Sequence, residues 1–134
     1  MSKTISLRTE IAAILNGVVT PTQKGRKKST PTGKVYYQQA EKGEHKYIVY
    51  TVDEILREDE RTTLELEINV MDYGSDTSTA ENLADQIQAE FDKKFIINND
   101  IAAYFYIDRR NAPVEEDRLV IRRRLTFTTY LYER

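Results

Sequence analysis

Apolar and polar side chains alternate without a break between Thr63 and Val70. Leu64, Leu66, Ile68 and Val70 fall on one face of an extended strand, and the polar residues between them fall on the other. The same residues would be scattered around the axis of a helix, so the pattern predicts a strand with one buried face. Because that face must be covered, we expect other elements of the chain to pack against it.

Two segments have the periodicity of amphipathic helices. Between Ser6 and Asn16 the apolar residues recur at helical spacing, and Gly17 follows where a left-handed cap favours glycine. A second helix is predicted to begin at Ser78, which forms a capping-box pattern with Glu81. Its apolar stripe, which should cover the sheet, consists of Leu83, Ala84, Ile87, Phe91 and Phe95, and Asn98 and Asn99 end it.

Four further segments are rich in tyrosine and β-branched residues and are predicted to be strands. Lys34–Gln39 and His45–Ile55 suggest a hairpin, and Ile101–Ile107 and Arg118–Tyr132 follow the second helix. The element order is therefore α-β-β-β-α-β-β. For 134 residues this predicts a single α+β domain over 1–134, a mainly antiparallel sheet of about five strands with two helices packed on one face.

Residues 20–34 are predicted to form a long, mobile, basic loop, because they contain prolines and glycines but only polar side chains otherwise. They belong to a stretch, Ile11 to Ala40, that has no Asp or Glu. Either the loop contacts phosphates or a carboxylate-rich protein surface, or it is a solvated loop that orders only in an assembly. Its candidate interface residues are Lys24, Arg26, Lys27, Lys28 and Lys34.

Three consecutive arginines, Arg122, Arg123 and Arg124, interrupt the last predicted strand, and Arg123 falls on its apolar face. An unpaired charge is not stable in a core. Either a bulge turns Arg123 away, or a carboxylate meets it, or the sheet face is open there. An inter-subunit salt bridge and a strand edge protected by charge are both consistent with the arginines.

The remaining ionisable residues predict no catalytic, cofactor or metal site. His45 is the only histidine, the chain has no cysteine, and we interpret His45 as a surface residue. The acids from Asp53 to Glu60 could hold a divalent cation, but a solvated strand end is the preferred interpretation. Glu58, Asp59 and Glu60 are kept as a candidate patch complementary to the basic loop.

Charge and hydropathy restrict the partners and the compartment. The formal net charge of -2 gives no overall attraction to nucleic acid or anionic lipid. No apolar run approaches the roughly 18 residues that span a bilayer, so no membrane partner is expected. The absence of cysteine fits synthesis in a reducing cytoplasm.

Three segments carry a resemblance to a known family: ILNG at the end of the first helix, LELEINVMDYGSDTSTAENLADQIQAEF in the centre, and the closing RLVIRRRLTFTTYLYER. In their order they resemble the tail-terminator or tail-to-head joining proteins of long, non-contractile-tailed bacteriophages. The resemblance extends over nearly the whole chain but depends on the order of elements and involves no invariant motif. The basic loop has no counterpart that aligns with a feature of the family.

The resemblance implies a structural virion protein without enzyme activity, made in the host cytoplasm and located in the tail at the head–tail interface. Six copies would form a ring that caps the tail tube, stops its elongation and joins it to the head connector. The implied partners are the tail-tube protein and the head-completion or stopper protein, with DNA passing through the ring. No cofactor is implied.

A different class of function stays open from the residues alone. A small nucleic-acid-binding or host-interacting regulator could use the same basic loop on phosphates. An RNA-cleaving toxin is a weaker alternative, because one histidine without an evident partner makes the chemistry hard to assign. Tight, steeply salt-dependent DNA binding without capping of tail tubes would favour the regulator.

Overall fold

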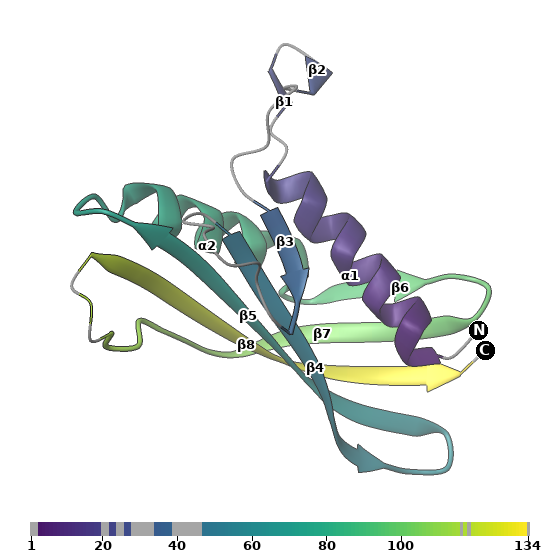
Figure 1. Ribbon diagram of the computed structural model, residues 1–134. Helices are drawn as coiled ribbons and strands as arrows, with labels where there is room; N and C mark the ends of the chain where they lie inside the picture. Colours follow the sequence, from purple (N-terminus) through teal and green to yellow (C-terminus); the bar gives the residue numbers. More distant parts are fainter. Residues whose placement is uncertain are drawn as a thin grey trace.

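The computed structural model describes residues 3–19, 22–23, 26–27, 34–38, 47–115, 117 and 119–133. Its two helices and eight strands are shown in Figure 1. Their bounds are α1 Lys3–Val19, β1 Thr22–Gln23, β2 Arg26–Lys27, β3 Lys34–Tyr37, β4 Tyr47–Arg57, β5 Arg61–Tyr73, α2 Ser78–Phe91, β6 Lys94–Ile97, β7 Ile101–Asn111 and β8 Val120–Glu133.

The main sheet has six strands in the order β3-β4-β5-β8-β7-β6, and β1 and β2 pair with each other in a separate small ribbon. Every pairing in the main sheet is antiparallel except that of β3 with β4. The predicted α+β class and mainly antiparallel sheet are confirmed, with one strand more than the five expected.

The predicted hairpin between the first two long strands is wrong, because β3 and β4 run parallel, with Val35 opposite Ile48 and Tyr37 opposite Tyr50. β-Propensity identified the segments as strands but carries no information on their direction. Val35 and Tyr37 pack against the core, and Arg8 of α1 lies 3.6 Å above the Tyr37 ring. These contacts place β3 beside α1 at the edge of the sheet.

The first helix continues two residues past Gly17, so the predicted glycine cap is wrong. Val19 is 1% exposed, and its burial accounts for the extra half turn. The other buried residues of α1 are Ser6, Leu7, Ile11 and Leu15. None of the described helices is both long enough and apolar enough to cross a membrane.

The second helix begins at Ser78 as predicted, but the capping box is not formed. Its N-cap residue, Thr77, makes no side-chain cap hydrogen bond, and the Ser78 hydroxyl donates to Asp76 at 2.7 Å. The helix also ends earlier than predicted, because Lys93 adopts a left-handed conformation with φ 61° and the chain then enters β6. Phe95 is therefore on a strand, where it is 52% exposed, and does not belong to the helical stripe.

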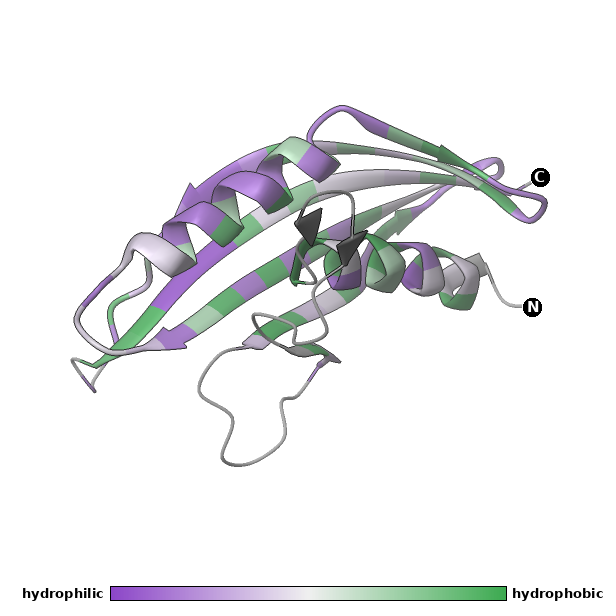
Figure 2. Cartoon of the chain, turned by 90° about the horizontal axis from the view of Figure 1, so that it is seen from above, coloured by the Kyte–Doolittle hydropathy of each residue, from purple (hydrophilic) through white to green (hydrophobic). Residues whose placement is uncertain are grey.

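The core lies between the two helices and one face of the sheet. Leu64, Leu66, Ile68 and Val70 are at most 2% exposed, which confirms the alternation predicted for this strand, and Figure 2 shows the corresponding hydrophobic and hydrophilic bands along the strands. Phe91 of α2 packs with its ring centroid 5.5 Å from Phe105 and 5.7 Å from Phe127. Each such buried side chain contributes about 1.5–3 kcal/mol to folding.

Candidate interaction surface

The second face of the main sheet, which we call the open face, carries the side chains that alternate with the core residues. On β5 these include Thr63, Glu65, Glu67 and Asn69. Both helices bury their apolar residues against the opposite face. The open face is therefore a regular surface that neither helix covers.

An aromatic row crosses three strands of the open face and is continued by an arginine on a fourth. Phe95 on β6 lies 6.3 Å from Tyr104 on β7, Tyr104 lies 6.3 Å from Tyr106, and Tyr106 lies 5.8 Å from Tyr130 on β8, measured between ring centroids. The row ends at β5, where the Arg61 guanidinium lies 4.5 Å from the Tyr130 ring centroid. Offset and tilted rings at these spacings attract one another, and a cation over a ring adds to the attraction.

Hydroxyl groups keep the row polar at one end. The Tyr106 and Tyr130 hydroxyl oxygens are 3.2 Å apart. This hydrogen bond raises the pKa of Tyr130 above its usual value, so the hydroxyl stays neutral at physiological pH. The row thus offers both apolar ring surface and hydroxyl donors, which is the combination that tyrosine supplies at protein interfaces.

Beside the aromatic row, the open face carries charged residues that are already paired within the chain. Two of the arginines predicted as interface residues lie here. Arg124 lies 3.5 Å from Glu67, and Arg122 donates to Asn69 at 2.8 Å and to Glu115 at 3.2 Å. The structure brings these two arginines together with acids of the same chain, so their charges are largely compensated locally.

Arg123 points to the other face, toward α2, where Glu81 receives it in a short guanidinium–carboxylate contact. Of the three outcomes considered for this residue, the meeting with a carboxylate is confirmed. Glu81 also binds Arg110 at 2.8 Å, and a bulge at Asp108 in β7 turns Arg110 toward the helix. The hydrogen bond from Arg123 lowers the pKa of Glu81 below its usual value. Arg110 had no distinguishing sequence signal, because its direction depends on the bulge.

The predicted acidic residues Glu58, Asp59 and Glu60 lie at the exposed turn between β4 and β5. Glu58 accepts a hydrogen bond from Arg61 at 3.1 Å, which joins this turn to the end of the aromatic row. In the part of the chain that the structure describes, no cluster of three acids or imidazoles has a geometry that could hold a metal ion.

The predicted basic loop is described only in part. Lys24 and Lys28 lie outside the described residues, as does His45. Arg26 and Lys27 form the backbone of β2, and Lys34 begins β3. The role of these five cations at an interface therefore stays a prediction.

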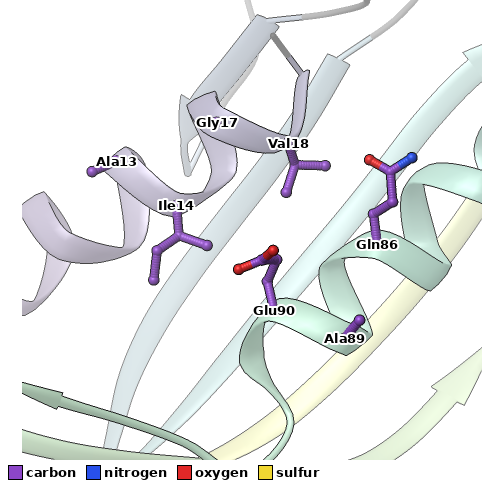
Figure 3. A pocket seen from close by; sticks show the side chains of 7 residues that line it. All are labelled: Ala13, Ile14, Gly17, Val18, Gln86, Ala89 and Glu90. Atoms are coloured by element: carbon purple, nitrogen blue, oxygen red, sulfur yellow. The ribbon is translucent and has the colours of Figure 1, made fainter. Parts of the chain in front are cut away.

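A groove of about 540 Å³ lies between the two helices on the outer side of the molecule (Figure 3). Ile14 and Val18 of α1 and Glu90 of α2 point into it. The remaining lining residues are Ala13, Gly17, Gln86 and Ala89. Sequence reasoning missed the groove because it arises from the packing of two helices that are far apart in the chain.

In comparisons with known proteins, no family model matches the chain and no curated protein matches it significantly.

Proposed function

We propose that this chain is a structural subunit of a phage virion that caps the tail tube as a ring, stops tail elongation and joins the tail to the head connector. The order of its segments resembles that of tail-terminator and tail-to-head joining proteins. The proposal assigns it the tail-tube protein, the head-completion or stopper protein and further copies of itself as partners, with DNA passing through the ring.

The observation that best supports this proposal is the aromatic row together with the exposed Phe95 and Ile97 at its end, which are 52% and 58% exposed. Large apolar side chains gathered on one surface are characteristic of protein–protein contacts. The arginines nearby have acids of the same chain as partners, so the surface does not carry the unbalanced positive charge that phosphate binding requires.

Electron microscopy of tails assembled without this protein tests the proposal. Overlong tubes without heads are expected, and the wild-type chain supplied in trans should restore tails of normal length that carry heads. Complementation with Phe95→Ser/Ile97→Ser should fail, whereas Val114→Ser, which alters a side chain that is 99% exposed outside the row, should complement. Tails of normal length with heads attached in the absence of the protein would contradict the proposal.

The second candidate function is a nucleic-acid-binding regulator. Arg61 stacked over Tyr130 favours it, because exposed bases also stack on aromatic rings and on guanidinium planes. Binding of single-stranded DNA or RNA that weakens steeply with salt, and weakens further in Tyr130→Ser, would support this candidate. If the protein binds nucleic acid in this way and its removal does not change tail length, the regulator would be favoured over the structural subunit.

A further inference from the structure

The main sheet has two edges that no described strand pairs. β6 is the last strand on one side. On the other side, β3 covers β4 only from Tyr47 to Tyr50, so none of the described strands pairs with the outer side of Val52–Arg57. Unpaired edges present backbone donors and acceptors to solvent and are templates for another strand.

Both edges carry large apolar side chains that are exposed to solvent. Ile55 and Leu56 on β4 are 60% and 53% exposed, and Phe95 and Ile97 on β6 are 52% and 58% exposed. Edges that must stay solvated are normally protected by charged residues or proline, not by exposed apolar pairs. The exposed apolar pairs are therefore the part of each edge that favours burial against another strand.

The charges on the two edges are opposite in sign and stand in the same order relative to the apolar pairs. On β4, Asp53 and Glu54 come directly before Ile55. At the start of β6, Lys93 and Lys94 come directly before Phe95. All four charged residues are exposed. Glu54 also accepts hydrogen bonds from Arg57 of its own strand at 2.9 Å, in an exposed pair of the kind that contributes little to stability. The Asp53–Glu54 and Lys93–Lys94 segments are complementary in charge, and each repels a copy of itself.

Strand direction decides how the two edges of neighbouring copies would meet. From β4 to β6 the sheet passes through four antiparallel pairings, by way of β5, β8 and β7, so β4 and β6 run in the same direction. A neighbouring copy in the same orientation then places its β6 parallel to β4. In a parallel pair the acids of one edge can face the lysines of the other, and Ile55 then faces Phe95.

The backbone of β4 shows which residues are available for this pairing. The Gln38 amide donates to the Tyr50 carbonyl at 3.0 Å, so Tyr50 directs its backbone groups to the outer side. Alternate residues of a strand direct their backbone groups to the same side. Glu54 therefore also presents its amide and carbonyl at the free part of the edge.

The corresponding residues of β6 follow from its turn. The Asn98 amide donates to the Ile101 carbonyl at 3.0 Å, so residue 98 faces β7 and the odd-numbered residues of β6 face outward. In a parallel ladder, a residue bonds to the two neighbours of the residue opposite it. Glu54 opposite Lys94 meets this condition at Phe95, whose backbone would bond that of Glu54, and the side chains of Glu54 and Lys94 both lie on the helix face of the sheet.

We propose that copies of this chain join edge to edge, with β4 of one copy pairing in parallel with β6 of the next and Glu54 opposite Lys94. The contact joins two different patches, so successive copies continue in one sense and close into a ring when the rotation permits. The inference deepens the ring assembly proposed above and rests on it. It differs in assigning the contact to two strand edges and not to the basic loop.

Cysteine cross-linking tests this register directly, because the natural chain has no cysteine. Opposed residues of neighbouring strands lie about 4.8 Å apart, within the range in which a disulfide forms. Glu54→Cys and Lys94→Cys are made as separate full-length proteins, mixed, oxidised and separated without reductant, both as purified protein and in tails that contain them. Glu90→Cys, exposed on α2, replaces Lys94→Cys in the control mixture.

A cross-linked dimer that needs both Glu54→Cys and Lys94→Cys is expected. Cross-links within Glu54→Cys alone or Lys94→Cys alone, at equal yield, would indicate a two-fold contact and overturn the proposal, as would a yield no higher than that of the Glu90→Cys control. Specific cross-links in a protein without effect on tail length would retain the edge contact and remove the proposed function. If tails made without the protein lack heads but no specific cross-link forms, the proposed function is retained and the edge contact is overturned.

Charge reversal supplies a second measurement on the same pair. Glu54→Lys and Lys94→Glu, each alone in a chain without added cysteine, should reduce the assembled mass at least tenfold, and the combined variant should restore it. Glu90→Lys, a reversal of the same size on α2, should leave assembly unchanged. Failure of the combined variant to recover, while each variant keeps the wild-type melting temperature, would overturn the pairing.

Discussion

Glu81 on α2 and Arg123 on β8 form a direct guanidinium–carboxylate contact between residues 42 positions apart, and Arg110 of β7 binds the same carboxylate. The side chain of Arg123 is 18% exposed and that of Glu81 is 42% exposed. One carboxylate thus ties the helix to two strands and compensates two cations at the margin of the core.

Replacing Glu81 by Gln should lower the free energy of unfolding by about 1–2 kcal/mol, because the largely buried Arg123 guanidinium loses its charged partner and that of Arg110 loses one of two. Asp85→Asn is the matched control: Asp85 also binds Arg110, at 2.7 Å, but its side chain is 66% exposed, and the loss should be smaller. Denaturant unfolding at pH 7 measures both. Equal losses would show that the Arg123 contact adds nothing.

The same contact predicts a pH dependence. The pKa of Glu81 is lowered in the folded state by the hydrogen bond from Arg123, so its stabilising effect is complete above the unfolded pKa, about 4.3, and is lost as the pH falls through the lower folded pKa. The difference in stability between the wild type and Glu81→Gln should therefore shrink below about pH 4. A difference that stays constant down to pH 2 would contradict this assignment.

Phe91 and Phe95 give a matched pair for the boundary between α2 and β6. Phe91 is 0% exposed and contacts two core phenylalanines, so Phe91→Ala should cost about 3–5 kcal/mol. Phe95 is 52% exposed, so Phe95→Ala should cost less than about 1 kcal/mol. Comparable costs in urea unfolding would mean that Phe95 is buried, as the helical stripe predicted from the sequence requires.

Gly17→Ala should raise stability by roughly 0.5 kcal/mol, because Gly17 lies within α1 and an added Cβ meets no atom within 4 Å. Gly74 is the control. Its Cβ also has open space, but its φ of +136° disfavours any other residue, so Gly74→Ala should cost about 1 kcal/mol or more. A loss of stability in Gly17→Ala would support the glycine cap that the structure excludes.

Neutralising the basic residues Lys24, Arg26, Lys27 and Lys28 should leave the melting temperature nearly unchanged and weaken assembly, because the segment from 20 to 34 has no apolar side chain besides its prolines that could anchor it to the core. Thermal unfolding and the yield of complete tails measure the two effects separately. A large drop in melting temperature would show instead that these cations hold the fold.

The parts of the fold that the sequence predicts are those controlled by local periodicity. The alternation from Leu64 to Val70 has one physical solution, and so does the stripe of α2 as far as Phe91. The errors occur where a distant contact decides the outcome. Lys93 ends α2 by a left-handed turn, and the burial of Val19 extends α1 past Gly17.

The candidate surface was predictable in composition but not in arrangement. The alternatives for Arg123 included a carboxylate partner, yet Glu81 was assigned to a cap because local capping patterns take no account of a strand 42 residues away. The aromatic row depends on register. The pairing of β6, β7 and β8 places Phe95 opposite Tyr104 and Tyr104 opposite Tyr130, and this brings the rings together. Register is set by the whole sheet, so the row has no signature in the linear sequence.

The docking of α1 has a consequence for synthesis on the ribosome. The Asn98 side-chain amide donates to the Ser6 hydroxyl, 92 residues earlier, and to the Glu10 carboxylate. At a translation rate of about 5–20 residues per second, α1 waits roughly 5–20 s after its own synthesis before these partners exist. The buried stripe of this helix, from Leu7 to Val19, is therefore exposed in the nascent chain until the β6–β7 turn that it contacts has been made.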